Sequence, residues 1–134
     1  MKNLRIETTS ENLEIVNAFI EKELENLECS PKKSMEILVS IEEIYVNIVH
    51  YAYDGNTGFA DITFDYNNGS VFITFTDEGI EFNPLKKEDP DITVPIGERP
   101  IGGLGIFMVK KTMDSVDYKR IDGKNILTIS KNIN

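Results

Sequence analysis

A long amphipathic segment in the first half of the chain is the sequence feature that most restricts which folds this chain can adopt. Ser30 suits a helix cap and Pro31 suits the first helical position, so the sequence predicts a helix from about Pro31 to near Ala52. Its apolar residues recur at helical spacing and form one stripe: Ile37, Ile41, Ile44, Ile48 and Ala52. A shorter helix is predicted before it, with Ser10 as its cap and an apolar stripe of Leu13, Val16, Ile20, Leu24 and Leu27.

Alternating apolar and polar residues predict five strands in the rest of the chain. These strands are residues 3–8, 59–66, 71–76, 116–121 and 124–131. Asn67-Asn68-Gly69-Ser70 and Asp122-Gly123 are typical of tight hairpin turns, and a third helix is predicted from Gly105 to Met113. The order of elements indicates an α+β fold, a two-layer sandwich with a mixed or antiparallel sheet and the helices on one face.

Length and composition indicate one globular domain. The 134 residues fit a single domain spanning 1–134, and a formal net charge of -9 makes nucleic acid an unfavourable partner. Cys29 is the one cysteine, which excludes an intrachain disulfide and favours a reducing compartment. The sequence shows neither an apolar leader nor a run of about 18 apolar residues, so we expect a cytoplasmic protein without a membrane span.

A polar stripe on the long predicted helix offers the first candidate chemistry. Its members are spaced four, three, four and three residues apart and share one face: Glu36, Ser40, Glu43, Asn47 and His50. Glu43 and Asn47 lie one turn apart, where a carboxylate can act as a general base and an amide oxygen is a hard ligand for Mg²⁺. Taken alone, such a stripe is more often a solvated helix face, and a lone histidine is more often structural.

Two glycine-containing turns give the other candidates. Asp77-Glu78-Gly79 closes a predicted strand, where a carboxylate can accept a hydrogen bond from an amine and a glycine lets a flat ring approach the backbone. Gly102-Gly103-Leu104-Gly105 opens a predicted helix, whose free N–H groups and dipole favour an anion. Residues 80–101 between them have no clean period, which is typical of a lid or binding loop. Each turn also has a plainer interpretation, a simple turn for the first and a flexible hinge for the second.

The three motifs together, in this order, are far more specific than any one of them. In them the chain resembles the ATP-binding domain shared by gyrase, histidine kinases and mismatch-repair proteins, which is the GHKL or Bergerat fold. The likeness is greatest to the branch of anti-sigma-factor serine-protein kinases. It rests on residues 43–53, 77–84 and 98–109, and it extends over nearly the whole chain.

The resemblance implies a role for each residue of the site. Glu43 would deprotonate a serine of a partner protein or orient the attacking water, and Arg99 would stabilise the γ-phosphate of ATP. Asn47 would hold Mg²⁺. Asp77 would accept a hydrogen bond from the adenine amino group, and Gly79 would make room for the base.

The resemblance also implies where the phosphates lie. Gly103 and Gly105 would cradle the phosphates. They belong to a glycine-rich helix start whose residues are Gly102, Gly103, Leu104 and Gly105. His50, one turn beyond Asn47, would reach a phosphate or shape the pocket, and residues 86–101 would form the ATP lid. Ile101 stands where histidine kinases commonly carry glycine, which counts against a sensor kinase, whereas the ending Phe82-Asn83-Pro84 suits the serine-kinase branch.

The function implied is that of an ATP-dependent serine-protein kinase with Mg²⁺ as cofactor. Its partners would be a small antagonist protein, phosphorylated on serine, and a sigma factor, and the protein would be a homodimer. A second interpretation is a nucleotide-dependent binding module that sequesters a partner without turnover. A third is the catalytic domain of a histidine kinase, which would need a phosphoacceptor histidine in another chain.

Overall fold

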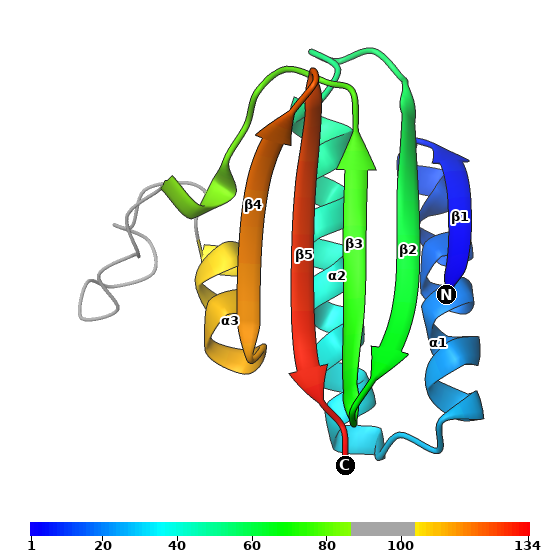
Figure 1. The fold of residues 1–134 in the computed structure, drawn as a ribbon. Coiled ribbons are helices and arrows are strands. Elements are labelled where there is room, and N and C mark those ends of the chain that lie inside the picture. The colour runs from blue at the N-terminus through cyan, green and yellow to red at the C-terminus, as the bar shows by residue number, and fades with distance from the viewer. Residues whose placement is uncertain (87–103) are drawn as a thin grey trace.

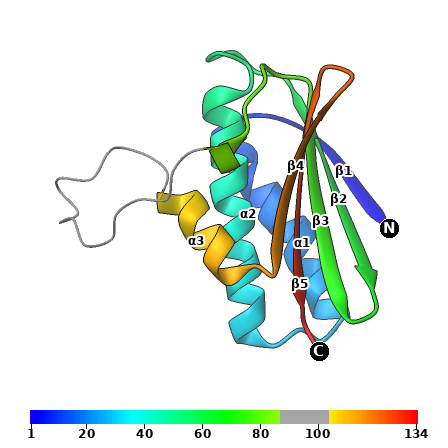
Figure 2. The same ribbon diagram turned by 60° about the vertical axis from the view of Figure 1, so that its left-hand side comes forward.

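Five antiparallel strands form a single sheet that is covered on one face by three helices in this computed structural model, which describes residues 1–86 and 104–134 (Figures 1 and 2). The spatial order of the strands is β1-β2-β3-β5-β4. The strands are β1 (Lys2–Glu7), β2 (Phe59–Asn67), β3 (Ser70–Asp77), β4 (Ser115–Ile121) and β5 (Lys124–Asn132). The helices are α1 (Leu13–Asn26), α2 (Pro31–Tyr51) and α3 (Leu104–Thr112), with short 3-10 turns at η1 (Ser10–Asn12) and η2 (Pro84–Lys86). The predicted α+β sandwich is confirmed, and its sheet is antiparallel throughout.

The long helix α2 begins where its sequence signals predict. The Ser30 hydroxyl accepts a hydrogen bond from the Lys33 backbone N–H at 3.3 Å, and Pro31 occupies the first turn, where its missing N–H costs nothing. All five residues of the predicted apolar stripe are buried against the sheet: Ile37, Ile41, Ile44, Ile48 and Ala52. The helix therefore forms the centre of the helical layer (Figure 1).

The start of the first helix differs from the prediction. Ser10 is not its cap, because the chain first makes the 3-10 turn η1 and the α-helix begins only at Leu13. The side chain of Asn12 turns back to donate to the Glu7 carbonyl at 2.8 Å, and it makes no cap hydrogen bond. The predicted apolar stripe is otherwise confirmed, since three of its residues are fully buried: Val16, Ile20 and Leu24.

The two hairpins have the turns that their sequences predict. Asn68 and Gly69 have φ of 51° and 83°, and Asp122 and Gly123 have φ of 52° and 77°. Left-handed backbone at both central residues matches the twist of paired strands, so it fixes the register of each hairpin. That register points one set of side chains toward the helices as the core: Ala60, Ile62, Phe64, Val71, Ile73, Phe75, Leu127 and Ile129.

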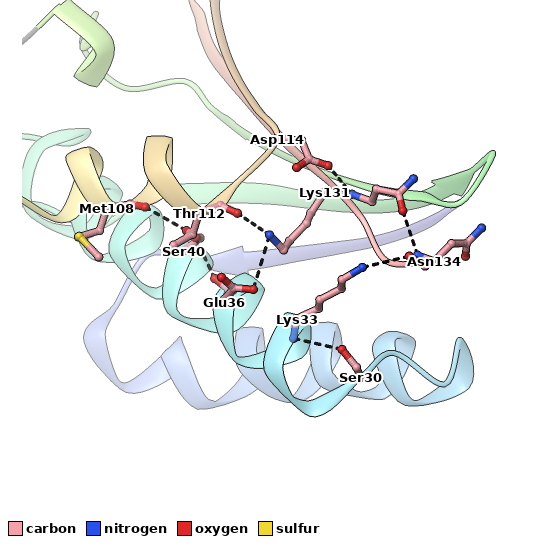
Figure 3. A network of polar contacts seen from close by, with 10 residues as sticks. Ser30, Lys33, Glu36, Ser40, Met108, Thr112, Asp114, Lys131 and Asn134 are labelled. Carbon is pink, nitrogen blue, oxygen red and sulfur yellow. Dashed lines mark hydrogen bonds and ion pairs between the residues drawn. The ribbon is translucent and has the colours of Figure 1, made fainter.

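A polar network fixes the C-terminal end of α3 against α2 and β5 (Figure 3). The Lys131 ammonium donates to the Thr112 carbonyl at 2.5 Å and forms an ion pair with Glu36 at 3.6 Å. Ser40 donates to the Glu36 carbonyl at 2.9 Å and lies 3.4 Å from the Thr112 hydroxyl. Because Ser40 is buried, this half of the polar stripe is not the solvated face that such a pattern usually forms.

None of the helices in the described part of the chain is both long enough and apolar enough to cross a membrane.

Candidate functional site

A hollow of about 420 Å³, partly open to solvent, lies between the helical layer and the sheet. Its walls are mainly apolar and come from α2, β3, β5 and α3, with members such as Ile44, Ile48, Phe75, Ile106 and Leu127. Four polar side chains reach it: Asn47, Asp77, Tyr118 and Asn125. An apolar cleft with a few fixed polar groups is the usual form of a site for a small ring-containing molecule.

Asp77 is the buried acid of this hollow. It continues the inward face of β3 beyond Phe75, so strand alternation aims its carboxylate at the helices, and only 5% of the residue is exposed. Its Oδ1 accepts hydrogen bonds from the Gly79 backbone N–H and from the Asn125 side-chain amide, both at 2.9 Å. Both hydrogen bonds that it accepts from described residues end on Oδ1, so Oδ2 is left to accept from a ligand.

Gly79 lies against the C-terminal end of α2. A Cβ at this position would sit 2.1 Å from the Ala52 carbonyl oxygen, and the neighbouring Ile80 N–H donates to that same oxygen at 2.8 Å. The obstructing atoms belong to backbone and cannot swing away. The contact gives this glycine a structural role, in addition to the room for a base that we expect from the resemblance.

We expect Gly79→Ala to lower the free energy of unfolding by about 1–3 kcal/mol, the usual cost of overpacking. The substitution also moves the N–H that holds Asp77, so ligand affinity at the hollow should fall. Chemical denaturation measures the first effect. Gly55→Ala measures a separate cost, that of a side chain on left-handed backbone, because φ there is 82° and a Cβ meets nothing within 4 Å. If Gly79→Ala unfolds at the same denaturant concentration as the wild type, Gly79 does not pack closely on the Ala52 carbonyl.

Glu43 does not line the hollow; it lies beside the first turn of α3, in a separate groove. It lines a groove between α2 and α3 of about 440 Å³, whose apolar members include Met35, Val39 and Met108. Gly105 also lines this groove, whereas the next residue, Ile106, lines the hollow. A Cβ on Gly105 would meet the Glu43 carboxylate oxygen at 2.0 Å, so the start of α3 packs directly on this acid. A helix N-terminus favours a negative charge at such a position.

Asn47 and His50 have different positions relative to the hollow. Asn47 is half-buried and lines the hollow together with Asp77, so the structure brings these two candidates together. His50 is exposed and is not among the described residues that line it; its ring lies 6.2 Å from the ring of Tyr51.

Some candidates lie outside the described residues. Arg99, Gly102 and Gly103 are among them, as is all of the expected lid 86–101 except Lys86. Leu104 is described as the first residue of α3.

The sequence interpretation missed the polar groups that the terminal hairpin contributes. Asn125 follows the Asp122-Gly123 turn and pairs with Asp77 in the register of β3 and β5. Its oxygen accepts a hydrogen bond from the Tyr118 hydroxyl at 2.5 Å. Burial, followed by the charge of Glu81, raises the pKa of Tyr118, so the phenol keeps its proton as a donor. One signal was available: a hairpin that places a polar residue at an inward position.

The combination of this fold with a strand-end carboxylate, an adjacent amide and an apolar hollow defines a class of small-molecule-binding domain. Residues 6–131 match the family described as "Histidine kinase-like ATPase domain", and the chain belongs to this family. The GHKL-type resemblance seen in the sequence is therefore confirmed.

Curated relatives and a solved structure agree with the family. The chain is 29% identical over 96 residues to serine-protein kinase RsbW of Bacillus thuringiensis (strain Al Hakam), and 31% identical over 96 residues to RsbW of Bacillus mycoides (strain KBAB4). Each alignment covers 69% of this chain and 60% of the relative, so the chain spans only part of their length. A crystal structure of the RsbU and RsbW domains of a Mycobacterium tuberculosis protein matches 99% of this chain and 33% of its own chain, with a TM-score of 0.67. At 17% identity this last likeness shows the fold alone.

Proposed function

We propose that this protein is an ATP-dependent serine-protein kinase of the anti-sigma type. One arrangement carries the proposal. The Asp77 carboxylate and Asn47 line the same apolar hollow. Glu43 lies one turn of α2 before Asn47, and its carboxylate packs against Gly105 at the start of α3. Phosphoryl transfer depends mostly on positioning and on charge neutralisation. These groups would supply the positioning, and Mg²⁺ and Arg99 would supply the positive charge. The likeness to RsbW kinases supports the same activity.

The hollow would hold the adenine of ATP. A carboxylate that offers only lone pairs requires a donor from its ligand, and the 6-amino group of adenine is such a donor. The flat base would lie between apolar walls that include Ile48 and Leu127. The phosphates would then extend toward the start of α3, where backbone N–H groups favour anions.

The donor set suits a magnesium ion that arrives with the nucleotide. The described residues contain no cluster of three or more histidine, cysteine or acidic side chains that could cage a metal by themselves. Mg²⁺ usually keeps several waters and takes one or two protein oxygens together with substrate phosphates, so the half-buried amide oxygen of Asn47 fits it. The ion would neutralise phosphate charge when bound.

Glu43 would act as the general base. It would accept the proton of the partner's serine hydroxyl while the serine oxygen forms a bond to the γ-phosphorus, and the bond to ADP breaks. The groove that Glu43 lines is open between α2 and α3, which provides an approach for a protein segment. The γ-phosphate role of Arg99 remains part of this proposal.

We expect Asn47→Ala to weaken the binding of Mg·ATP by about tenfold or more, while metal-free ADP loses little, because only the metal link is removed. Calorimetry with and without EDTA measures the difference. Asn67→Ala, on an exposed strand end, is the control. Equal losses for both ligands would exclude Asn47 as the metal ligand.

The proposed partners are a small antagonist protein and a sigma factor. This chain would phosphorylate the antagonist and bind the sigma factor. We propose that it does so as a homodimer in the cytoplasm. The partner can be isolated by pull-down and identified by mass spectrometry. The test of the proposal is then transfer of label from the γ-phosphate of ATP to a serine of that partner. Incorporation of phosphoserine supports the kinase, and sedimentation of the purified chain tests the homodimer.

A nucleotide-dependent binding module is the second candidate, and one observation favours it. Glu43 lines the groove rather than the hollow that contains Asp77, so base binding does not require it. Such a protein would use ATP or ADP to set its shape and would sequester a partner without turnover. Tight ATP binding with no transfer to an isolated partner would favour this second function.

A further inference from the structure

We propose that Asn125 is a positioning residue that fixes the Asp77 carboxylate in the orientation that selects a 6-amino purine over a 6-oxo purine. This inference rests on the proposed nucleotide function and extends it to a residue of the terminal hairpin. Asn125 lies directly opposite Asp77 in the pairing of β3 with β5, and 6% of it is exposed.

Every polar atom of the Asn125 side chain is engaged by the protein. Its amide nitrogen donates to Asp77 Oδ1 at 2.9 Å and to the Ile80 carbonyl at 2.7 Å. Its oxygen accepts from the Tyr118 hydroxyl at 2.5 Å, from an Arg120 guanidinium N–H at 3.1 Å and from the Phe82 N–H at 3.3 Å. Because both N–H groups and the oxygen are used within the protein, the polar effect of Asn125 on a ligand in the hollow acts through Asp77.

The pattern of donors and acceptors permits only one orientation of this amide. Two acceptors face its nitrogen and three donors face its oxygen, so a flipped amide would oppose like groups on both sides. Arg120 also donates to the Gly79 carbonyl at 2.8 Å, which holds the turn after β3 from the same hairpin. A buried network that is fully satisfied in this way is rigid.

The orientation of Asp77 follows from this network. With Oδ1 held by the Gly79 N–H and by Asn125, the carboxylate presents Oδ2 as a fixed acceptor. A 6-amino group donates to that oxygen, whereas the 6-oxo group of hypoxanthine or guanine opposes it with a lone pair. Without Asn125 one tether is lost, the carboxylate can rotate, and the penalty against a 6-oxo group falls.

The test compares ADP with inosine diphosphate by calorimetry on the full chain. We expect the wild type to bind ADP about 10²-fold more tightly, because a site built for a hydrogen bond rejects the analogue that lacks it. In Asn125→Ala we expect this ratio to fall to about 10, from the loss of one charge-assisted hydrogen bond to Asp77. Asn132→Ala, an exposed asparagine at the end of β5, should keep the wild-type ratio.

The ratio separates positioning from a merely structural role. A smaller folded fraction lowers the apparent affinity for both nucleotides equally and leaves their ratio unchanged. Tyr118→Phe removes one donor to Asn125 and is the milder variant if Asn125→Ala does not fold; we expect it to lower the ratio about threefold. An unchanged ratio in a folded variant, with tight ADP binding by the wild type, would overturn this inference alone. Failure of the wild type to bind ADP would overturn the proposed function with it.

Discussion

Glu43→Gln should bind Mg·ATP as the wild type does and lose the transfer of phosphate to serine by a factor on the order of 10²–10⁴. Glutamine keeps the size and hydrogen bonding of the side chain but cannot accept the serine proton. The half-buried position of Glu43 beside the start of α3 tolerates a neutral group of the same shape. Calorimetry measures nucleotide binding, and single-turnover labelling of the isolated partner measures transfer.

The neighbouring acid is the control for this substitution. Glu42 precedes Glu43 and points about 100° away around α2, and it is exposed. We expect Glu42→Gln to transfer phosphate at nearly the wild-type rate. If Glu43→Gln also retains that rate, Glu43 is not the base.

Gly105→Ala should reduce transfer on the order of 10²-fold and leave the fold intact. Its Cβ would overlap the Glu43 carboxylate, and this carboxylate, at the end of a flexible side chain, would move to relieve the clash. A displacement of about 1 Å in a catalytic group can cost about 10² in rate. Gly105→Val should have a larger effect and also oppose the approach of phosphate to the backbone, so nucleotide affinity should fall as well.

Lys111→Ala separates the position of Gly105 from general damage to α3. Lys111 lies on the same helix, is exposed and is not among the described residues that line the hollow or the groove, so its truncation should change neither nucleotide affinity nor the unfolding midpoint much. Circular dichroism checks the fold of each variant. Wild-type transfer by Gly105→Ala would show that the close packing on Glu43 has no catalytic consequence.

Local signals in the sequence were sufficient to predict most of the fold. Ser30-Pro31 marks the start of α2, and Asn68-Gly69 and Asp122-Gly123 mark the hairpins, because each signal acts within a few residues. The prediction of Ser10 as the helix cap was wrong because the Asn12 side chain donates to the Glu7 carbonyl at the end of β1, and a 3-10 turn precedes the helix. The choice between a mixed and an antiparallel sheet depends on long-range pairing, which the local pattern does not contain.

The sequence predicted those residues of the candidate site that belong to motifs of fixed spacing. It did not predict residues that come together only through the pairing of distant strands. Asn47 and Asp77 both line the hollow, although 30 positions separate their numbers in the sequence. Asn125 was missed because its contact with Asp77 depends on the pairing of β3 with β5. Ser40, expected in a polar stripe, is buried between α2 and α3: its hydroxyl donates to the Glu36 carbonyl of α2 and lies against the Thr112 hydroxyl of α3.

The most direct test of the central claim is a titration of the isotope-labelled chain with Mg·ATP, followed by amide resonances in NMR spectra. A nucleotide in the hollow should shift the amides of Asn47, Asp77, Gly79 and Asn125 at saturation. Phe72, exposed on β3, should remain unchanged. Titration of Asp77→Ala should abolish the shifts of the other three site amides at the same concentration. The absence of shifts around the hollow in the wild type, or the same shifts in Asp77→Ala, would contradict the assignment of this hollow as the ATP site.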